Sequence, residues 1–308
     1  MELALTANRK VYTRVGIAMA VQLLLSMALQ FGVQWAIAYM GYRIEAGTWG
    51  YYMVAMLPQY LVAMPIAYII LMRIPVQQGV PKVKLKGAQL GSIALVCLAF
   101  MYAGNLIGVV ISMIISALSG NQMVNLLEEL VNKSDIWTTA VVMVLVAPVV
   151  EELFFRKLLI GRLRGYGQRA AVVVSAVAFG LAHGNLSQVF YAFGLGLVFG
   201  YIYTITNRIE YTIALHVGIN FLGSVVAPLL LRAGMAYTSI YGMLMLVGVI
   251  FGAVHFFKHR RSIRFADEWW APPVPWKKPA LGNAGMIVFY IVCAAIFALN
   301  TWWALQPA

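Results

Sequence analysis

Three short polar clusters interrupt long apolar runs between residues 137 and 220, and their residue types could do chemistry. The whole chain has ten acidic residues and four histidines, and two of each fall in these clusters. An ionisable group in hydrocarbon costs roughly 2.5–3.5 kcal/mol on insertion scales, which makes each one a candidate functional group. The clusters contain seven candidate site residues: Glu151, Glu152, Arg156, Phe179, His183, His216 and Asn220.

The first cluster holds two adjacent carboxylates with different neighbours. Neighbouring residues on a helix point about 100° apart, so Glu151 and Glu152 can have different tasks. Arg156 follows Glu152 by four residues on the same face, and these two are predicted to pair. The pair could be a purely structural ion pair. Glu151 is left as the unpaired carboxylate, a candidate general base or acid.

The second cluster is predicted to face the first across a helical hairpin. The turn residues 165–167 separate two apolar runs, with Glu151 16 residues before Gly167 and His183 16 residues after it. At 1.5 Å per residue, both lie about 24 Å from the turn. A carboxylate and an imidazole at that level could hold and deprotonate a water molecule. Phe179, one turn below His183, could form a wall of the site. Alternatively, a histidine in a membrane helix can simply hydrogen-bond a neighbouring helix.

The third cluster places two polar side chains on one helix face. His216 and Asn220 are separated by four residues. Histidine can donate a proton or bind metal, and an asparagine N–H can stabilise a developing oxyanion. Taken together, the clusters supply a base, a water-holding imidazole and two donors for a tetrahedral intermediate. Those groups could hydrolyse an amide.

The elements that must position these residues are transmembrane helices. The chain has 308 residues, is 62% hydrophobic and has 10% charged residues, against about 25% charged in a soluble domain. The net charge of +12 is spread over short loops, which favours contact with anionic lipid and argues against nucleic acid. Cys97 and Cys293 lie in apolar runs, so we expect them to pack between helices and to form no disulfide framework or Cys-rich metal site.

Apolar runs of about 20 residues predict an all-α polytopic transmembrane helical bundle of about 8–9 spans. We divide the chain into N-terminal spans and an outer loop (1–136), a catalytic core of four helices that carries the site (137–231), and C-terminal spans with a basic cytoplasmic loop (232–308). The predicted spans are 15–40, 50–72, 89–117, 137–155, 169–184, 188–206, 212–231, 237–257 and 283–304.

Loop charge predicts the orientation. With the N-terminus in the cytoplasm, 19 of the 22 Lys and Arg residues fall on the inner side, Arg156 among them. We therefore expect a multi-pass cell-membrane protein, with a layout that fits a prokaryotic cytoplasmic membrane, an uncleaved first span and an outer C-terminus. Residues 118–136 are predicted to be an outer loop with a short amphipathic helix. Trp269, Trp270 and Trp276 in the inner loop 258–281 are predicted to anchor it at the lipid interface.

The order EExxxR, FxxxH, HxxxN within residues 137–231 resembles the CPBP family, the CAAX-processing and bacteriocin-processing (Abi-type) intramembrane proteases. All seven motif positions are filled. The resemblance implies an intramembrane endopeptidase that cleaves a membrane-associated peptide or protein. It further implies that Glu151 and His183 activate the water, that His216 and Asn220 form an oxyanion hole, and that Glu152 and Arg156 support the site.

Alternatives remain for the mechanism and for the function. The family has been described both as zinc metalloproteases and as glutamate proteases. The chain lacks HExxH, and although His183, His216 and Glu151 could supply three zinc ligands, Asn220 is a poor fourth. We therefore favour a cofactor-free glutamate mechanism over a zinc-dependent one. The other functional hypothesis is a non-catalytic scaffold that regulates a membrane or cell-envelope protein partner. A transporter is disfavoured because two-half symmetry is not visible.

The sequence also predicts how a substrate reaches the site. In a simple up-and-down arrangement, His216 lies near the inner face and His183 lies deeper. The helices must therefore be offset, or the turn 184–187 must lie inside the membrane. Non-helical backbone is tolerated there only when it is buried in protein or lines a watery cavity. We expect such a cavity, open to the cytoplasmic side and laterally to lipid.

Overall fold

The computed structural model describes residues 2–77, 79–265 and 276–306, which form helices and connecting loops without a strand. The α-helices in the N-terminal half are α1 (Glu2–Tyr39), α2 (Trp49–Leu57), α3 (Met64–Met72), α4 (Gly87–Ser119), α5 (Leu126–Lys133), α6 (Ile136–Thr139) and α7 (Ala147–Glu152). Those that follow are α8 (Gly161–Leu163), α9 (Gln168–Ala182), α10 (Leu186–Thr206), α11 (Ile209–Phe221), α12 (Ala227–Ala233), α13 (Met235–His259), α14 (Lys277–Leu281) and α15 (Ala284–Ala304).

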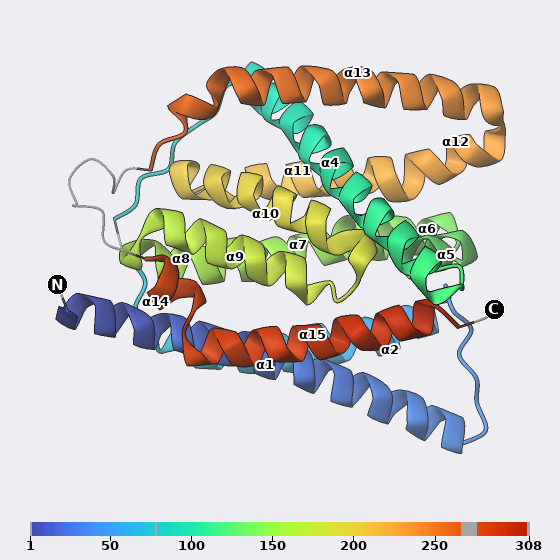
Figure 1. Cartoon of the computed structure of the whole chain (residues 1–308), viewed down its shortest axis with the longest axis horizontal. Helices are drawn as coiled ribbons and strands as arrows, with labels where there is room; N and C mark the ends of the chain where they lie inside the picture. The colour runs from blue at the N-terminus through green and yellow to red at the C-terminus, as the bar shows by residue number, and fades with distance from the viewer. Residues whose placement is uncertain (1, 78, 266–275, 307–308) are drawn as a thin grey trace.

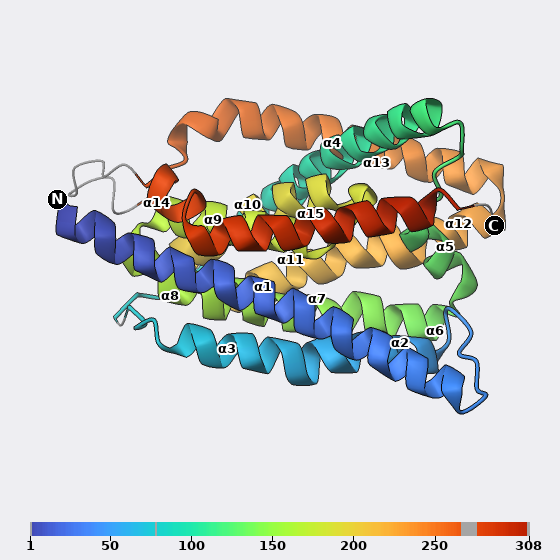
Figure 2. The same ribbon diagram turned by 60° about the horizontal axis from the view of Figure 1, so that its bottom comes forward.

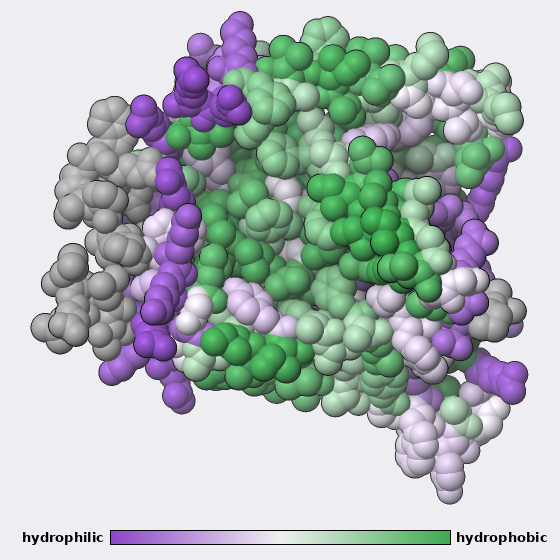
Figure 3. Space-filling view, in the orientation of Figure 1, coloured by the Kyte–Doolittle hydropathy of each residue, from purple (hydrophilic) through white to green (hydrophobic). Residues whose placement is uncertain are grey.

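Within the described residues, eight helical runs are long and apolar enough to cross a membrane. Figure 3 shows a broad apolar band between two hydrophilic margins. The N-terminal end of α1 and the C-terminal end of α15 lie at opposite ends of the bundle (Figure 1). The predicted all-α polytopic bundle is confirmed. The fifth predicted span, 169–184, is the short helix α9, whose 15 residues reach only about 22 Å at 1.5 Å per residue, less than a bilayer core of about 30 Å.

The bundle is built around α9 and α10. In Figure 1, α10 lies between α9 and α4, and α13 covers the far side of α4. On the other side of the core, α1 packs along α15 and against α3 (Figure 2). The main buried cluster joins α1, α9 and α15 through side chains such as Met19, Phe179 and Phe289. These packed helices surround the segment that carries the first polar motif.

Several spanning runs contain π-helical turns, and most of these turns have a proline as their cause. In the described chain, the π-helical stretches are η1 (Pro58–Ala63), η2 (Ala140–Val146), η3 (Leu153–Ile160) and η5 (Leu222–Val226). Three of them end two residues before Pro65, Pro148 or Pro228. Proline has no N–H to donate and crowds the carbonyl four residues back, so a widened turn accommodates it. Since η2 and η3 flank α7, the two adjacent carboxylates lie between two widened stretches.

The helix that contains the fourth predicted span, 137–155, extends beyond it. The helical run that begins at Ile136 continues to Tyr166, and Arg156 is fully buried inside it. Arg156 is therefore a buried helix residue and not part of a loop, and its charge is matched by Glu152 within the bundle.

The sequence also predicted a loop helix, two buried cysteines and three interfacial tryptophans. The amphipathic loop helix is present as α5, with a Lys133–Glu129 ion pair on its surface. Cys97 and Cys293 are free and buried, as predicted. Trp276 directly precedes α14, whereas Trp269 and Trp270 lie outside the described residues.

Candidate active site

A tight turn aligns the first two motifs. The segment Arg164–Tyr166 forms a single 3-10 turn, and Gly167 adopts φ 123° before α9 begins. A side chain would be strained at that φ, so glycine suits the position. The returning helix packs along η3, where the Ser175 hydroxyl donates to the Phe155 carbonyl oxygen at 2.9 Å. The predicted hairpin is confirmed, and Glu151 and His183 line the same cavity.

Glu152 is the centre of a buried polar cluster. Its Oε2 lies 3.1 Å from Arg156 Nε, which confirms the predicted pair, and both residues are fully buried. Its Oε1 lies 3.0 Å from Nδ1 of His216, 64 residues further along the chain. No guanidinium nitrogen of Arg156 reaches hydrogen-bond geometry with a described partner. The contact with the carboxylate is therefore electrostatic rather than a directed hydrogen bond.

Aromatic rings complete the surroundings of the buried arginine. The Arg156 guanidinium carbon lies 4.4 Å from the centroid of the Phe179 ring and 5.6 Å from that of Phe199. A cation over an aromatic face is attracted by the ring quadrupole, and the attraction is larger when water is excluded. Phe179 therefore stabilises the positive charge in addition to forming a wall of the site.

Glu151 has a different environment from its neighbour. Its side chain is 18% exposed, and its Oε2 lies 3.8 Å from Nε2 of His216. The imidazole of His216 therefore lies between the two carboxylates, with Nδ1 toward Glu152 and Nε2 toward Glu151. Because Glu152 is closed off by Arg156, Glu151 is the carboxylate that a molecule in the cavity can reach.

The hydrogen bond of His183 defines which ring nitrogen is free. Its Nδ1 lies 2.7 Å from the Phe179 carbonyl oxygen. A carbonyl can only accept, so Nδ1 carries the proton and Nε2 of the neutral ring keeps its lone pair. The Phe179 ring meets His183 edge to face at 4.9 Å and His216 at 5.7 Å between centroids. One phenylalanine thus orients both histidines.

Asn220 is held from a neighbouring span. Its Nδ2 donates to the Met143 carbonyl oxygen of η2 at 2.8 Å, and its side chain lines the same cavity. A side-chain amide has two N–H donors. One is used for this anchor, and the second can point toward a bound molecule.

The cavity that joins these groups has a volume of about 370 Å³. It extends away from the motifs toward Tyr52 at the start of α2 and toward Leu127 and Leu130 of α5. With the orientation predicted from loop charge, those elements are on the outer side, and the cavity would then open there and not toward the cytoplasm. Beyond Glu152, the buried side chains of Arg156 and Leu159 fill the space in the other direction.

Sequence reasoning missed several polar residues of the cavity. Tyr60 of η1 and both Gln188 and Tyr191 of α10 line it beside the motif residues. Gln188 lies near the start of α10, where the Asn185 side chain caps the helix. A glutamine in an otherwise apolar run was the available signal, since a buried amide needs partners.

The histidine and carboxylate groups of the site are candidate ligands for a zinc ion. Within the described residues, no group of three or more His, Cys, Asp or Glu side chains is placed to hold a metal ion. Zinc requires ligand atoms that converge at about 2.0–2.2 Å from one point. In this arrangement Nδ1 of His216 is engaged by Glu152 and Nδ1 of His183 by a carbonyl. These contacts leave Nε2 of each ring free, as in many zinc-bound histidines, so the misfit of His183, His216 and Glu151 is only that their atoms do not converge on one point in the described arrangement.

A helical membrane bundle with a carboxylate–histidine cluster around an internal cavity has the features that an intramembrane hydrolase requires. Residues 133–222 match the model of a protein family described as type II CAAX prenyl endopeptidase Rce1-like. The match includes all seven motif residues and confirms the family resemblance read from the sequence. The matched stretch is 90 of the 308 residues, and it makes this part of the chain similar to endopeptidases of the CAAX type. No curated protein and no solved structure matched the chain.

Proposed function

We propose that the chain hydrolyses a peptide bond in a membrane-associated peptide or protein with water activated by Glu151 and His183. The observation that carries the proposal is one shared cavity, lined by Glu151, His183, His216 and Asn220. We further propose that residues 137–231 act as the catalytic core and that the protein works in a prokaryotic cytoplasmic membrane with its N-terminus inside.

The first step is proton transfer from a water molecule. Glu151 is the accessible carboxylate, so it takes a proton from the water, while Nε2 of His183 accepts the second O–H as a hydrogen bond. The resulting hydroxide attacks the carbonyl carbon of the scissile bond, and the carbonyl oxygen takes up the negative charge. When the C–N bond breaks, the protonated Glu151 returns its proton to the leaving amine. General acid–base steps of this kind contribute about 10²–10⁴-fold in rate.

The oxyanion that develops during the attack needs hydrogen-bond donors. Asn220 offers the N–H that Met143 does not occupy. His216 uses Nδ1 for Glu152, so it can donate from Nε2 only when both ring nitrogens carry a proton. In that state the carboxylate of Glu152 faces the imidazolium and holds it in place, as the buried aspartate of a catalytic triad does. The role of Glu152 is thus to position and charge His216, and the role of Arg156 is to hold Glu152.

The test combines a peptide substrate pool with a carboxylate variant. Purified protein is incubated with a quenched fluorescent peptide pool, and Glu151→Gln is compared with Glu45→Gln, an exposed glutamate outside the cavity. We expect Glu151→Gln to lose about 10²–10⁴-fold in rate and Glu45→Gln to match the unmodified protein. We also expect a metal chelator to leave the rate unchanged, since the proposed steps use no metal ion.

Two outcomes would count against this mechanism. Full hydrolysis by Glu151→Gln would remove the proposed base. Activity that a chelator abolishes and added zinc restores would assign the zinc-dependent alternative, with His183, His216 and Glu151 as ligands. If neither the protein nor its variants cleave any peptide, the scaffold hypothesis gains support, and co-purified membrane protein partners become the object of study.

A further inference from the structure

A second, larger cavity lies beside the candidate active site and contains none of the catalytic residues. It has a volume of about 770 Å³ and lies between η1 and α3 on one side and η3 and α8 on the other. Tyr60 and Met64 line both cavities, so the two are neighbours that share a wall. A volume of this size holds a ligand the size of a lipid headgroup with part of its chains.

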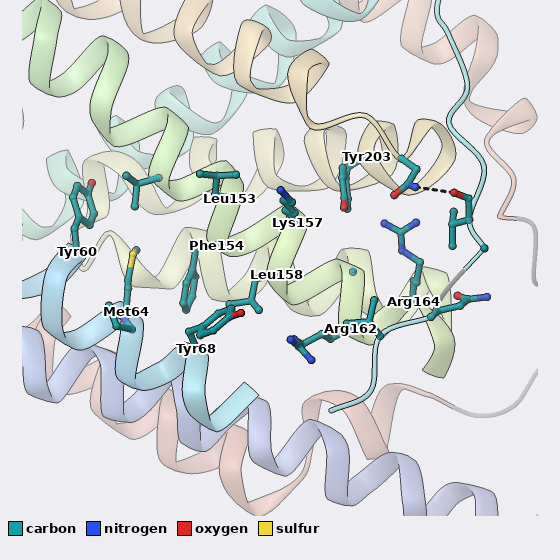
Figure 4. Close-up of a pocket in the computed structure, with 18 residues that line it drawn as sticks. Tyr60, Met64, Tyr68, Leu153, Phe154, Lys157, Leu158, Arg162, Arg164 and Tyr203 are labelled. Atoms are coloured by element: carbon teal, nitrogen blue, oxygen red, sulfur yellow. Dashed lines mark hydrogen bonds between the residues drawn. The ribbon is translucent and has the colours of Figure 1, made fainter. Parts of the chain in front are cut away.

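One half of the second cavity is apolar and reaches the surface of the bundle. Figure 4 shows Tyr60, Met64, Tyr68, Phe154 and Leu158 gathered at this end. Two lining residues at this end, Leu153 and Tyr68, are 40% and 42% exposed. Both lie on runs long and apolar enough to span a membrane, so the cavity is open on a side that faces lipid chains.

The other half is strongly basic. Lys157, Arg162 and Arg164 line it (Figure 4), and none of the described lining residues is acidic. Basic pockets between transmembrane helices bind acidic lipid headgroups, and each basic group contributes. The apolar and basic lining residues are therefore distributed as in a binding site for an amphiphile whose anionic end lies toward the arginines.

Two of these arginines have buried nitrogens without a partner. Arg164 is only 5% exposed, with its guanidinium carbon 4.9 Å from the centroid of the Tyr203 ring. Its Nε and Nη1 have no hydrogen-bond partner in the described part of the chain, and neither does Nε of Arg162. Nη1 of Arg162 donates to the Ile74 carbonyl. Buried donors are normally satisfied, so these nitrogens indicate a missing acceptor.

The geometry leads us to infer that this cavity binds one anionic phospholipid from the membrane. Its phosphate is held by Arg164 and Lys157, and its acyl chains lie along the side chains of Leu158, Phe154 and Tyr68. An arginine fork with unused N–H groups matches phosphate oxygens, and Lys157 adds an exposed cationic amine. The site is separate from the proposed peptide hydrolysis and does not depend on it.

The test measures lipid retention by the full-length protein. Delipidated protein in neutral detergent is titrated with dioleoylphosphatidylglycerol or with dioleoylphosphatidylcholine, and bound lipid is counted by native mass spectrometry. We expect one phosphatidylglycerol per chain at about tenfold lower concentration than phosphatidylcholine, because each basic group near the headgroup adds to the preference.

The variants separate the site from general surface charge. Arg164→Gln and Lys157→Gln should each reduce the preference for phosphatidylglycerol several-fold, and Arg232→Gln, at an exposed arginine at the end of α12, should leave it unchanged. Leu158→Trp fills the apolar half while keeping all three cations, so it should weaken retention of phosphatidylglycerol. Unfolding midpoints without added lipid identify any variant that has lost its fold.

Two results would overturn the inference. One is equal retention of the two lipids by the unmodified protein. The other is unmodified retention of phosphatidylglycerol by both Lys157→Gln and Leu158→Trp. Lys157 is exposed, so its variant is expected to fold and remains informative if Arg164→Gln does not.

Discussion

At the scale of single residues, the site depends on how two adjacent glutamates are made different. Glu152 is buried between Arg156 and His216, while Glu151 faces the cavity. The helix separates their directions by about 100°, so identical side chains meet unlike partners. The Glu152 charge is matched by Arg156, and a buried charge that is paired in this way can remain in an apolar interior.

The buried ion pair leads to a prediction about stability. Arg156→Met removes the cation and leaves Glu152 buried with one partner fewer, so we expect a loss of about 3–5 kcal/mol in the free energy of unfolding. The double variant Glu152→Gln with Arg156→Met removes both charges and should recover much of that loss. Denaturant unfolding in mild detergent measures both variants. A loss below about 1 kcal/mol, the range of an exposed pair, would mean that the ion pair does not support the fold.

At the scale of elements, close helix packing depends on glycine. A Cβ atom built at Gly252 of α13 would lie 1.9 Å from the Leu95 carbonyl oxygen of α4, and one at Gly285 of α15 would lie 2.0 Å from the Thr13 carbonyl oxygen of α1. Small residues let membrane helices approach closely and gain van der Waals contact. The two outer helix pairs, α4 with α13 and α1 with α15, therefore need these positions to remain without side chains.

A matched pair of variants on α13 tests this packing. Gly252→Leu should push α13 away from α4 and lower stability by about 1–3 kcal/mol, as overpacking does. Gly242→Leu lies on the same helix, where an added Cβ meets nothing within 4 Å, and should be neutral or slightly stabilising. Thermal unfolding in detergent compares the two variants. Equal effects would show that the backbone approach at Gly252 contributes nothing to stability.

At the scale of the whole molecule, the arrangement predicts how the ends lie across the membrane. The described residues form eight helical runs long enough to cross a membrane and the short α9, and the start of α1 and the end of α15 lie at opposite ends of the bundle (Figure 1). The charge bias of the loops predicts that the N-terminal end lies inside. Ser119, at the end of α4, should then face outward, and Ser262, in the 3-10 turn after α13, should face the cytoplasm.

Cysteine labelling in intact cells checks this topology. A membrane-impermeant maleimide should label Ser119→Cys without lysis and Ser262→Cys only after lysis. The native cysteines Cys97 and Cys293 are buried, so the unmodified chain should give a low background. The reverse pattern would invert the orientation and would place the opening of the candidate active site on the cytoplasmic side.

The sequence alone determined the features that depend on local spacing. Apolar length predicted the bundle, the four-residue spacing predicted the Glu152–Arg156 pair, and the turn at Gly167 predicted that Glu151 and His183 come level. Each follows from helix geometry within one run or one hairpin, so no knowledge of distant contacts was needed.

Only the tertiary structure decided how separate runs meet. The bond between His216 and Glu152 joins residues 64 positions apart, and the basic cavity around Arg164 is lined from separate runs of the chain, with α3, η3 and α10 among them. The direction of the catalytic cavity also depends on α2 and α5, which the motifs do not contain. Helix periodicity specifies which face a residue occupies. Which neighbour covers that face is decided by side-chain packing across the whole bundle.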